Sequence, residues 1–418
     1  MLIKNNLINN KSTFKAKLLT LSLLSTISAP SQAIVNGSIV DKSDSPAWMV
    51  ALLATGELPA NDRQFCGGML IAHDWVLTAA HCVNTTAPTE IEVAIGINDL
   101  DDLDDETKKK AIQTRKVDRV ILHPKYFDDE SPWRHLGNLE NDIALIRLKD
   151  LAAPQTPLLQ LSDHVPISGT ESTLYGWGLA KSEQKDTKPF EYKGHKAEVE
   201  ETVQEAVSYP WLEKLTVEVN TAQVCKTRFL PQFQQQVQEA TNELPLAKQN
   251  LNSLHTIKHL LTLDINNLVD NNTKVEEQQV LALKANDIVA FKKHKKEKEA
   301  IASDYELLNE KLEKISSAYD ELNSEINSLP AYTQYITNNY VFPNNSLCVN
   351  SVTTPDAGPC NGDSGGPLVI NENGMDKLIG IASFVGGGCG NPDSGNFYTG
   401  VHAYKNWIEK TMKDHRAY

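Results

Sequence analysis

The chain has 418 residues, 40% of them hydrophobic, and a formal net charge of −14 at pH 7. This length allows two or three domains of ordinary size. The acidic balance argues against binding to nucleic acid, because phosphates require a basic surface.

Residues 1–33 have the pattern of a secretory signal peptide. The segment carries four lysines, no acids and a short apolar run ("LLTLSLLSTISA"), and "SQA" places small residues at the cleavage positions. The run is too short to span a bilayer, which disfavours a membrane anchor, and no later run is long enough. Cleavage would take the net charge from −14 to −18 (−14 minus 4). We therefore expect a secreted protein, extracellular or periplasmic, without a membrane span.

Short strand-like runs follow from residue 34 onward. They include "AWMVALLA", "GGMLIA", "WVLTAA", "IEVAIG", "RVILH" and "IALIRL", and the pattern returns after residue 346 with "PLVI", "LIGIASFV" and "FYTGV". Runs of this length between Gly, Pro, Asp and Asn predict a β-barrel or sandwich. The last segment, "YKNWIEKTMKDH", predicts a short helix with one apolar face, formed by Tyr404, Trp407, Ile408 and Met412.

An acid-rich loop, "NDLDDLDDE", occupies residues 98–106. Oxygen ligands suit calcium, so this loop is a candidate calcium site. A solvated run of charges is the favoured interpretation, and we expect no other cofactor.

The pattern changes near residue 226. Apolar residues then recur in steps of four and three, from Phe233 to Leu268 and from Ile301 to Leu329. Such heptads predict helices that pack on a partner helix. With a turn at "DNNT", residues 270–273, they predict a helical hairpin with arms of about 40 residues and about 60 Å. The run "KKHKKEKE" between the two series is interpreted as a solvated face.

Three features weaken the first of these arms. Pro245 should kink it, and Lys258 and Asn272 fall on the apolar seam.

Ser364 lies in "GPCNGDSGGPLV" and is the candidate nucleophile. The same residues satisfy G-x-S-x-G, the nucleophile elbow of α/β-hydrolases, in which an acid and then a histidine follow the serine. Only 54 residues (418 minus 364) follow Ser364, and alternating β/α units are absent from the pattern. The elbow interpretation is therefore disfavoured.

Two upstream residues are better partners for this serine. His81 ends the strand-like run "WVLTAAHC", and Asp142 opens "NDIALIRL". Taken alone, His81 is as compatible with an ordinary loop histidine as with a catalytic base. Asp142, taken alone, is as compatible with a solvated acid as with a residue that orients the base.

The motifs "IVNG", "LTAAHC", "NDIALI", "GWG" and "GDSGGP" occur in this order. Residues 34–229 and 346–418 therefore resemble the trypsin/chymotrypsin family of serine endopeptidases. The resemblance implies a mainly β fold, with two six-stranded antiparallel barrels and an active site in the cleft between them. Residues 1–33 are then the signal peptide, and residues 230–345 are a helical, coiled-coil insertion into the protease domain.

The resemblance also assigns roles to the motif residues. It makes His81 the general base, Asp142 the residue that orients it, and Ser364 the nucleophile. Backbone N–H groups of Gly362 and Ser364 would form the oxyanion hole.

In this family a freed terminal amine pairs with the acid before the nucleophile, here Ile34 with Asp363. Because the predicted signal cleavage lies directly before Ile34, export itself would release the active terminus. Cleavage after Ala29 is the alternative, and it would leave a tetrapeptide that begins at Pro30.

The chain has six cysteines, and an even number in an oxidising compartment predicts three disulfides. The resemblance implies the pairs Cys66–Cys82, Cys360–Cys389 and Cys225–Cys348. The last pair also flanks the helical block, whose two ends must return to nearly the same place. No cysteine pattern indicates zinc.

The resemblance places Gly358, Ser383, Val385 and Asn396 at the substrate pocket. Gly358 offers no acid for an Arg or Lys side chain, and Val385 and Asn396 stand where glycine is common. We therefore expect small or medium uncharged side chains before the cut.

Three functions remain open on these grounds, of which the third is esterase activity without cleavage of proteins. The first is a secreted endopeptidase acting on proteins or peptides, with a helical arm that positions substrate or binds a protein partner. The second is a non-enzymatic binding protein that uses the arm on a protease scaffold.

Overall fold

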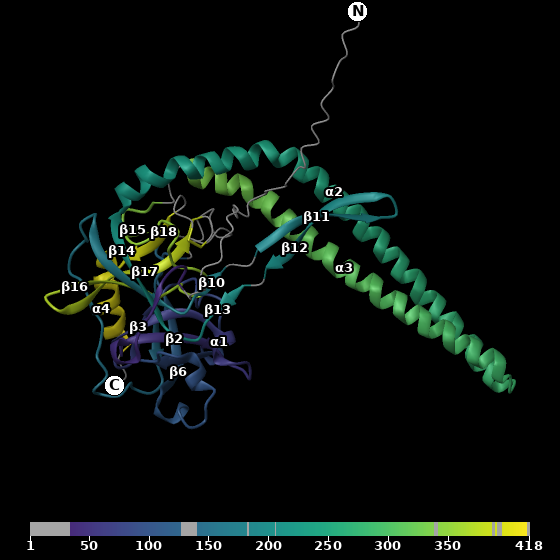
Figure 1. Cartoon of the computed structure of the whole chain (residues 1–418), viewed down its shortest axis with the longest axis horizontal. Coiled ribbons are helices and arrows are strands. Elements are labelled where there is room, and N and C mark those ends of the chain that lie inside the picture. Colours follow the sequence, from purple (N-terminus) through teal and green to yellow (C-terminus); the bar gives the residue numbers. More distant parts are fainter. Residues whose placement is uncertain are drawn as a thin grey trace, which may run out of the picture. The chain divides into compact units, whose positions relative to one another are not determined.

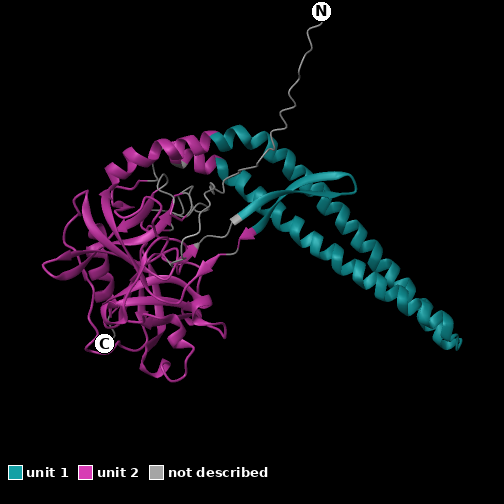
Figure 2. Cartoon of the chain, viewed as in Figure 1, with its two compact units in different colours: residues 1–19, 185–202, 239–329 teal, residues 20–184, 203–238, 330–418 magenta. Residues whose placement is uncertain are grey.

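The computed structural model describes residues 34–126, 140–181, 184–204, 206–337, 342–386, 389–390 and 395–415. The predicted signal peptide, residues 1–33, lies outside them. The described chain forms two compact units (Figure 2). The helical unit contains residues 185–202 and 239–329, and the barrel unit contains the other described residues.

The first barrel of the barrel unit is a closed sheet of six antiparallel strands (Figure 1). In spatial order its strands are β2 (Met49–Ala54), β3 (Gln64–Ala72), β4 (Trp75–Thr78), β7 (Ala144–Leu148), β6 (Gln113–Leu122) and β5 (Ile91–Ile95). Strands β2 and β4 are buried along almost their whole length, as their continuous apolar runs predict.

The second barrel closes through the pairing of β9 with β14. In spatial order its strands are β14 (Glu213–Thr221), β15 (Ser346–Ser351), β18 (Asn396–Gly400), β17 (Met375–Val385), β16 (Pro367–Glu372) and β9 (Thr170–Gly176). The predicted fold of two six-stranded antiparallel barrels is confirmed. The second barrel is discontinuous in sequence, because both helices of the insertion lie between β14 and β15.

Short elements complete the barrel unit. They are β1 (Ser38–Ile39), β8 (Gln160–Leu161), β10 (Leu179–Lys181), β13 (Val207–Ser208), α1 (Ala60–Arg63) and α4 (Lys405–Asp414). The predicted C-terminal helix is α4. Tyr404, directly before it, and Ile408 are buried, and Trp407 and Met412 pack beside them, so the predicted apolar face is confirmed.

The insertion contains two helices, α2 (Ala222–Lys284) and α3 (Ile288–Thr337). The predicted turn at residues 270–273 is wrong, because α2 continues through it. The chain turns instead at residues 285–287, where Asn286 has φ +56° and Asp287 accepts a hydrogen bond from the Ala290 amide at 2.9 Å. A left-handed asparagine after one helix and an aspartate N-cap before the next explain why the chain turns at this point.

The helical unit also contains a β-hairpin that the sequence did not predict, β11 (Gln184–Tyr192) with β12 (His195–Gln204). Its turn residues Lys193 and Gly194 both have positive φ, as a two-residue hairpin loop requires. Ala197 and Val199 of β12 lie in one buried cluster with helix residues Leu254, Ile257, Leu261 and Ile315. The hairpin therefore packs on the helices (Figure 1).

Heptad residues Leu254, Leu261, Ile315 and Ile326 are buried as predicted, whereas Tyr305 is 40% exposed.

The three predicted disulfides are all present, Cys66–Cys82, Cys225–Cys348 and Cys360–Cys389. Cys225 lies in the first turn of α2 and Cys348 in β15, so this bond fixes the start of the insertion to the second barrel. Around it, Phe229, Phe233, Phe342 and Phe397 form a buried aromatic cluster. Within the described residues, no helix combines the length and apolar character that crossing a membrane requires.

Candidate active site

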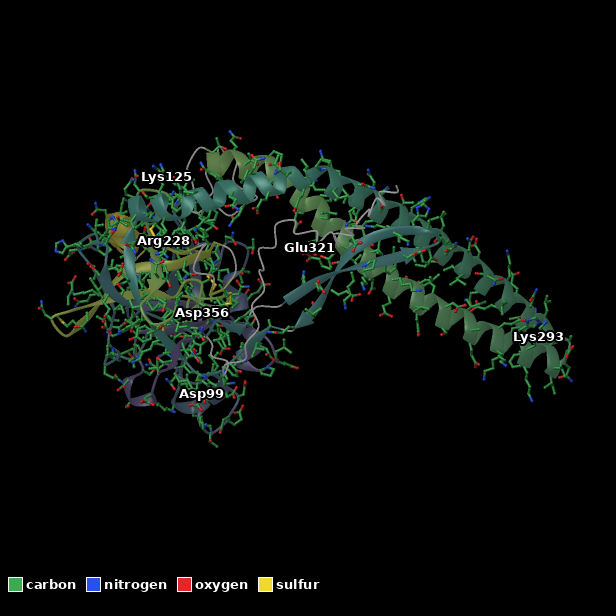
Figure 3. The ribbon with its side chains drawn as sticks, turned by 45° about the horizontal axis from the view of Figure 1, so that its top comes forward. Asp99, Lys125, Arg228, Lys293, Glu321 and Asp356 are labelled. Carbon is green, nitrogen blue, oxygen red and sulfur yellow. A yellow bond between two sulfur atoms is a disulfide. The ribbon has the colours of Figure 1, made fainter. Side chains whose placement is uncertain are left out.

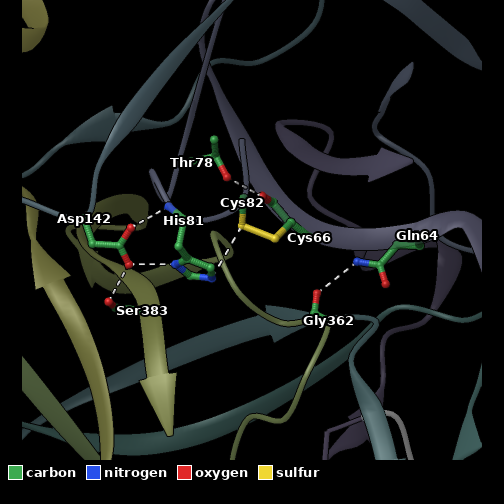
Figure 4. The surroundings of a disulfide bond; sticks show 9 residues. Gln64, Cys66, Thr78, His81, Cys82, Asp142, Gly362 and Ser383 are labelled. Carbon is green, nitrogen blue, oxygen red and sulfur yellow. Dashed lines mark hydrogen bonds and ion pairs between the residues drawn. A yellow bond between two sulfur atoms is a disulfide. The ribbon is translucent and has the colours of Figure 1, made fainter. Parts of the chain in front are cut away.

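His81 and Asp142 meet at the edge of the first barrel (Figure 4). His81 follows β4, and Asp142 lies two residues before β7, the strand that pairs with β4. Asp142 Oδ2 accepts a hydrogen bond from His81 Nδ1 at 2.8 Å, and Oδ1 accepts one from the His81 backbone amide at 2.9 Å. The carboxylate therefore fixes both the ring and the backbone of the histidine.

The electrostatics of this pair favour a charged imidazole. Burial by itself lowers the pKa of His81, but the charge of Asp142 and its hydrogen bond outweigh burial, and the net pKa is raised above 6.5. Asp142 is only 2% exposed, so its charge is poorly screened by water.

Ser383 of β17 completes the surroundings of Asp142. Its hydroxyl donates a hydrogen bond to Asp142 Oδ2 at 2.6 Å, and Figure 4 shows the aspartate between this serine and the histidine. The sequence placed Ser383 in the substrate pocket. In the structure its hydroxyl links the second barrel to the aspartate of the first.

Ser364 lies in a tight loop before β16. Its carbonyl accepts a hydrogen bond from the Gly67 amide at 2.7 Å, and the next residue, Gly365, donates to the Ala382 carbonyl at 2.8 Å. Gly67 adjoins Cys66, whose disulfide partner Cys82 follows His81. The loop is therefore hydrogen-bonded to the residue beside Cys66, on the His81 side, and to the residue before Ser383, on the Asp142 side. The Ser364 hydroxyl itself forms no hydrogen bond within the described part of the chain.

The loop conformation requires its glycines. Gly365 has φ +76°, and a Cβ added to it would come within 2.2 Å of Thr78 Oγ1. Gly362 has φ +98°, and its carbonyl accepts a hydrogen bond from Gln64 Nε2 at 2.9 Å (Figure 4). Among the described residues, the amides of Gly362 and Ser364 donate no hydrogen bond. Two neighbouring N–H groups are thus available to a ligand oxygen.

Asp363, between these two amides in sequence, is buried. It accepts hydrogen bonds from the amides of Gly178 and Cys360, both at 2.8 Å. Desolvation, with a contribution from the charge of Glu213, raises its pKa to about 7, although the two amide bonds oppose the shift.

The Ile34 backbone nitrogen donates to Glu213 Oε2 at 2.9 Å, and both residues are fully buried. In the full chain this nitrogen is an amide, not a terminal amine. The Ile34–Asp363 ion pair therefore stays a prediction for the cleaved chain. Glu213 is a second buried carboxylate near Ile34, and no sequence motif indicated it.

The other predicted pocket residues lie together on the second barrel. Val385 and Asn396 are paired across β17 and β18, and a Cβ added to Gly358 would come within 2.8 Å of Asn396 Nδ2. Asn396 is 6% exposed, and its Oδ1 is buried without a hydrogen-bond partner among the described residues. The asparagine side chain therefore covers Gly358 with a polar, incompletely satisfied group.

The acidic loop at residues 98–106 satisfies several of its carboxylates internally. Asp102 is buried and contacts Lys42 at 3.1 Å and Lys108 at 2.6 Å. Asp104 accepts a hydrogen bond from the Ala60 amide, and Asp99 accepts one from Asp101. Calcium binding at this loop stays an untested expectation.

The potential ligand atoms of His81, Cys66 and Cys82 lie within 4.8 Å of one another, but the disulfide removes both thiolates that a metal would need.

Sequence reasoning missed the roles of Gln64, Glu213 and the Ser383 hydroxyl. Gln64 and Gly362 are 298 positions apart in the chain, and Ile34 and Glu213 are 179 apart. A local motif carries no signal for contacts of this kind. Only a three-dimensional template could have indicated them.

Two closed antiparallel barrels, with a hydrogen-bonded His–Asp pair at the edge of one and a glycine-rich serine loop from the other, define a chymotrypsin-like fold. A family model described as Trypsin matches residues 34–227 and 269–408, which together exceed half of the chain. The chain therefore belongs to the trypsin family of serine proteases.

Individual relatives match over shorter stretches. Mouse vitamin K-dependent protein C is 32% identical over 164 residues, which cover 38% of this chain and 31% of that protein. Human trypsin-3 is 32% identical over 192 residues, or 45% of this chain and 55% of the relative. The chain thus spans about a third to about half of the length of these relatives.

A solved structure also matches, that of neuropsin, a serine protease expressed in the limbic system of mouse brain. It has 20% sequence identity and a TM-score of 0.48, and the match covers 91% of this chain and 100% of neuropsin.

Proposed function

We propose that this protein is a secreted serine endopeptidase that hydrolyses peptide bonds through His81, Asp142 and Ser364. The observation that carries the proposal is the buried carboxylate of Asp142, which holds both the ring and the backbone of His81. A serine hydroxyl becomes a nucleophile only when a neighbouring base takes its proton, and an imidazole can do so near neutral pH.

In the proposed reaction, His81 Nε2 takes the proton of the Ser364 hydroxyl as Oγ attacks the peptide carbonyl. The carbonyl oxygen becomes negatively charged, and the amides of Gly362 and Ser364 stabilise it. His81 then gives the proton to the leaving amine, and water hydrolyses the acyl-enzyme by the same steps. Ser364 and His81 share no hydrogen bond in the described structure, and such bonds often form only when substrate binds.

Activation would follow cleavage before Ile34, whose new ammonium would lie near the buried carboxylates of Asp363 and Glu213. Asp363 is the predicted partner, since its neutralisation would fix the loop that carries Gly362 and Ser364. Terminal sequencing of the secreted protein tests this route, and a mature start at Pro30 would contradict direct activation by signal cleavage.

The pocket supports a preference for small or medium uncharged side chains before the cut. Gly358 provides no acid, and Asn396 occupies the space above it. The helical unit would position protein substrates or bind a partner, with its two arms packed as a coiled coil.

The alternative function is a binding protein that uses the helical unit on an inactive scaffold. Labelling with a fluorophosphonate probe separates the two. We expect the wild-type protein to be labelled and Ser364→Ala not to be, whereas equal absence of label in both proteins, after confirmed cleavage before Ile34, would exclude the proposed activity.

A further inference from the structure

The turn between α2 and α3 exposes a group of apolar side chains. Within the described residues of this turn, exposures are 63% for Leu281, 64% for Leu283, 64% for Ile288 and 80% for Val289. The turn is well formed, because Asn286 ends one helix and Asp287 caps the next. These side chains are therefore held outward by an ordered backbone. We call the four residues the apolar tip.

Lysines follow the apolar tip along both helices, one at the end of α2 and five in the first turns of α3. Residues 284–298 contain six lysines and two acids, a net charge of +4 (6 minus 2) within a chain of net charge −14. Lys284, Lys292, Lys295 and Lys296 are exposed and form no ion pair among the described residues. Figure 3 shows Lys293 beside the turn at the end of the helical hairpin.

The nearby acids are largely occupied. Glu276 contacts Lys298 at 2.6 Å, and Glu297 contacts His294 at 2.9 Å and Lys293 at 3.8 Å. Asp287 caps α3. Exposed Glu277 is the nearest remaining carboxylate on α2, and Glu299 lies beyond the lysines on α3. The positive charge at the turn is therefore only partly compensated.

The size of the tip distinguishes between classes of partner. The ends of two helices, each about 10 Å across, present an area of about 200 Å². A specific protein interface, including one with a second copy of this chain, needs about 800 Å² on each side. Exposed apolar side chains with lysines beside them suit instead a negatively charged lipid surface, into which such side chains insert by about 5–10 Å.

We propose that the apolar tip and its lysines bind the surface of a membrane rich in anionic phospholipids. The apolar side chains enter the boundary between headgroups and acyl chains, and the lysines contact lipid phosphates. This attachment requires no membrane-spanning helix and does not depend on the catalytic activity. It would place the protein at a membrane surface while the rest of the chain, which is acidic, stays in solution.

Sedimentation with lipid vesicles tests this proposal on the full mature chain. The two vesicle types are phosphatidylcholine alone, and equal parts of phosphatidylcholine and phosphatidylglycerol. We expect binding to the second type only, with affinity that falls as salt is raised because the lysines are screened.

Two sets of surface substitutions localise the binding. Leu283→Ser with Ile288→Ser and Val289→Ser removes apolar contacts, and Lys292→Gln with Lys295→Gln and Lys296→Gln removes charges. Each set should lower vesicle affinity by at least about tenfold. The matched control carries Leu307→Ser and Lys248→Gln, exposed positions of the same helices away from the turn, and should bind like the wild type.

Several outcomes would overturn the proposal. The first is no binding to anionic vesicles. The second is an equal loss of vesicle affinity in the control variant, and the third is a vesicle affinity that the serine substitutions leave unchanged. Light scattering of the same proteins measures their oligomeric state and provides a further test. A wild-type dimer that the serine substitutions dissociate, without vesicle binding, would show that the tip contacts a second copy instead.

Discussion

At the residue scale, the His81–Asp142 pair determines how activity should depend on pH. The proposed general base works only when His81 is neutral, and its pKa is raised above 6.5 by Asp142 despite the opposing effect of burial. We expect kcat/KM to rise with pH through a limb whose apparent pKa exceeds 6.5, and to be lost as pH falls through it.

Asp142→Asn should move this limb of the profile to lower pH. It should also decrease kcat on the order of 10⁴-fold, as for other serine proteases with this triad. A pH profile with a chromogenic peptide measures both effects. Ser383→Ala, which removes only the hydrogen bond from the Ser383 hydroxyl to Asp142, is the milder comparison. An unchanged limb in Asp142→Asn would show that another group controls the titration.

Asn396 is expected to set the size of the substrate pocket. Its amide lies against Gly358, so Asn396→Gly should open the space above Gly358 and remove a buried unsatisfied oxygen. We expect the variant to cleave after larger side chains than the wild type does, when both are profiled on a peptide library. Val385→Gly, at the pocket entrance, is the comparison that shows how much of the restriction comes from the neighbouring strand. An identical profile for Asn396→Gly would place the substrate side chain elsewhere.

The residues that carry the proposed chemistry were predictable from sequence because short ordered motifs contain them. His81, Asp142 and Ser364 each lie in such a motif. The contacts of Gln64 and Glu213 were not predictable, since each joins segments more than a hundred residues apart and neither residue type is required by a local pattern.

At the element scale, the sequence predicted the helices and most strands better than it predicted where the chain turns and which elements pack together. Heptads gave both helices of the insertion, but "DNNT" was mistaken for their turn because asparagine and aspartate are common in turns. In the structure this segment continues α2, where Asn272 bonds Glu276 at 3.3 Å. The hairpin β11–β12 was missed because its apolar residues Ala197 and Val199 bury against helices rather than strands.

Glu325 of α3 gives the helical unit a pH-dependent stability. Burial, together with the charges of Glu200 and Glu321, raises its pKa from 4.5 to about 7, although Lys185 opposes the shift. The folded state therefore binds more protons than the unfolded state between these values, and stability falls as pH rises through this window.

Glu325→Gln should remove that penalty. At pH 8 we expect the free energy of unfolding of the variant to exceed that of the wild type by about 1–2 kcal/mol. This value is smaller than the full pKa shift would give, because the side chain is partly exposed. At pH 4 the two proteins should be alike. Urea unfolding followed by helical circular dichroism measures this, with exposed Glu310→Gln as control, and an equal gain at both pH values would point to a packing effect instead.

At the scale of the whole molecule, the sequence predicted one insertion between barrel strands, whereas the helical unit is built from two separate stretches. Residues 185–202 supply its hairpin and residues 239–329 supply its helices. Part of each helix belongs to the barrel unit, because Phe229, Phe233 and Ile336 lie in the cluster around Cys225–Cys348. The boundaries for removing the unit therefore lie inside the helices, not at residues 230 and 345.

This division predicts different outcomes for two deletions, each closed by a short Gly/Ser linker. Removing residues 239–329 alone would expose Ala197 and Val199 and leave a strand pair without a core, so we expect aggregation. Removing residues 185–202 as well should give a soluble protein that still hydrolyses a small peptide, because the barrels and the three disulfides are intact.

Activity on whole proteins then reveals what the helical unit does. If it positions substrates, the double deletion should keep kcat/KM for the peptide but lose cleavage of folded proteins, since remote contacts contribute to binding only when the substrate is large enough to reach them. If the double deletion and the full mature protein cleave each of the two substrates at the same rate, the unit has no part in substrate choice. Loss of peptide cleavage in the soluble double deletion would instead mean that the barrels depend on the helical unit, contrary to the division into two units.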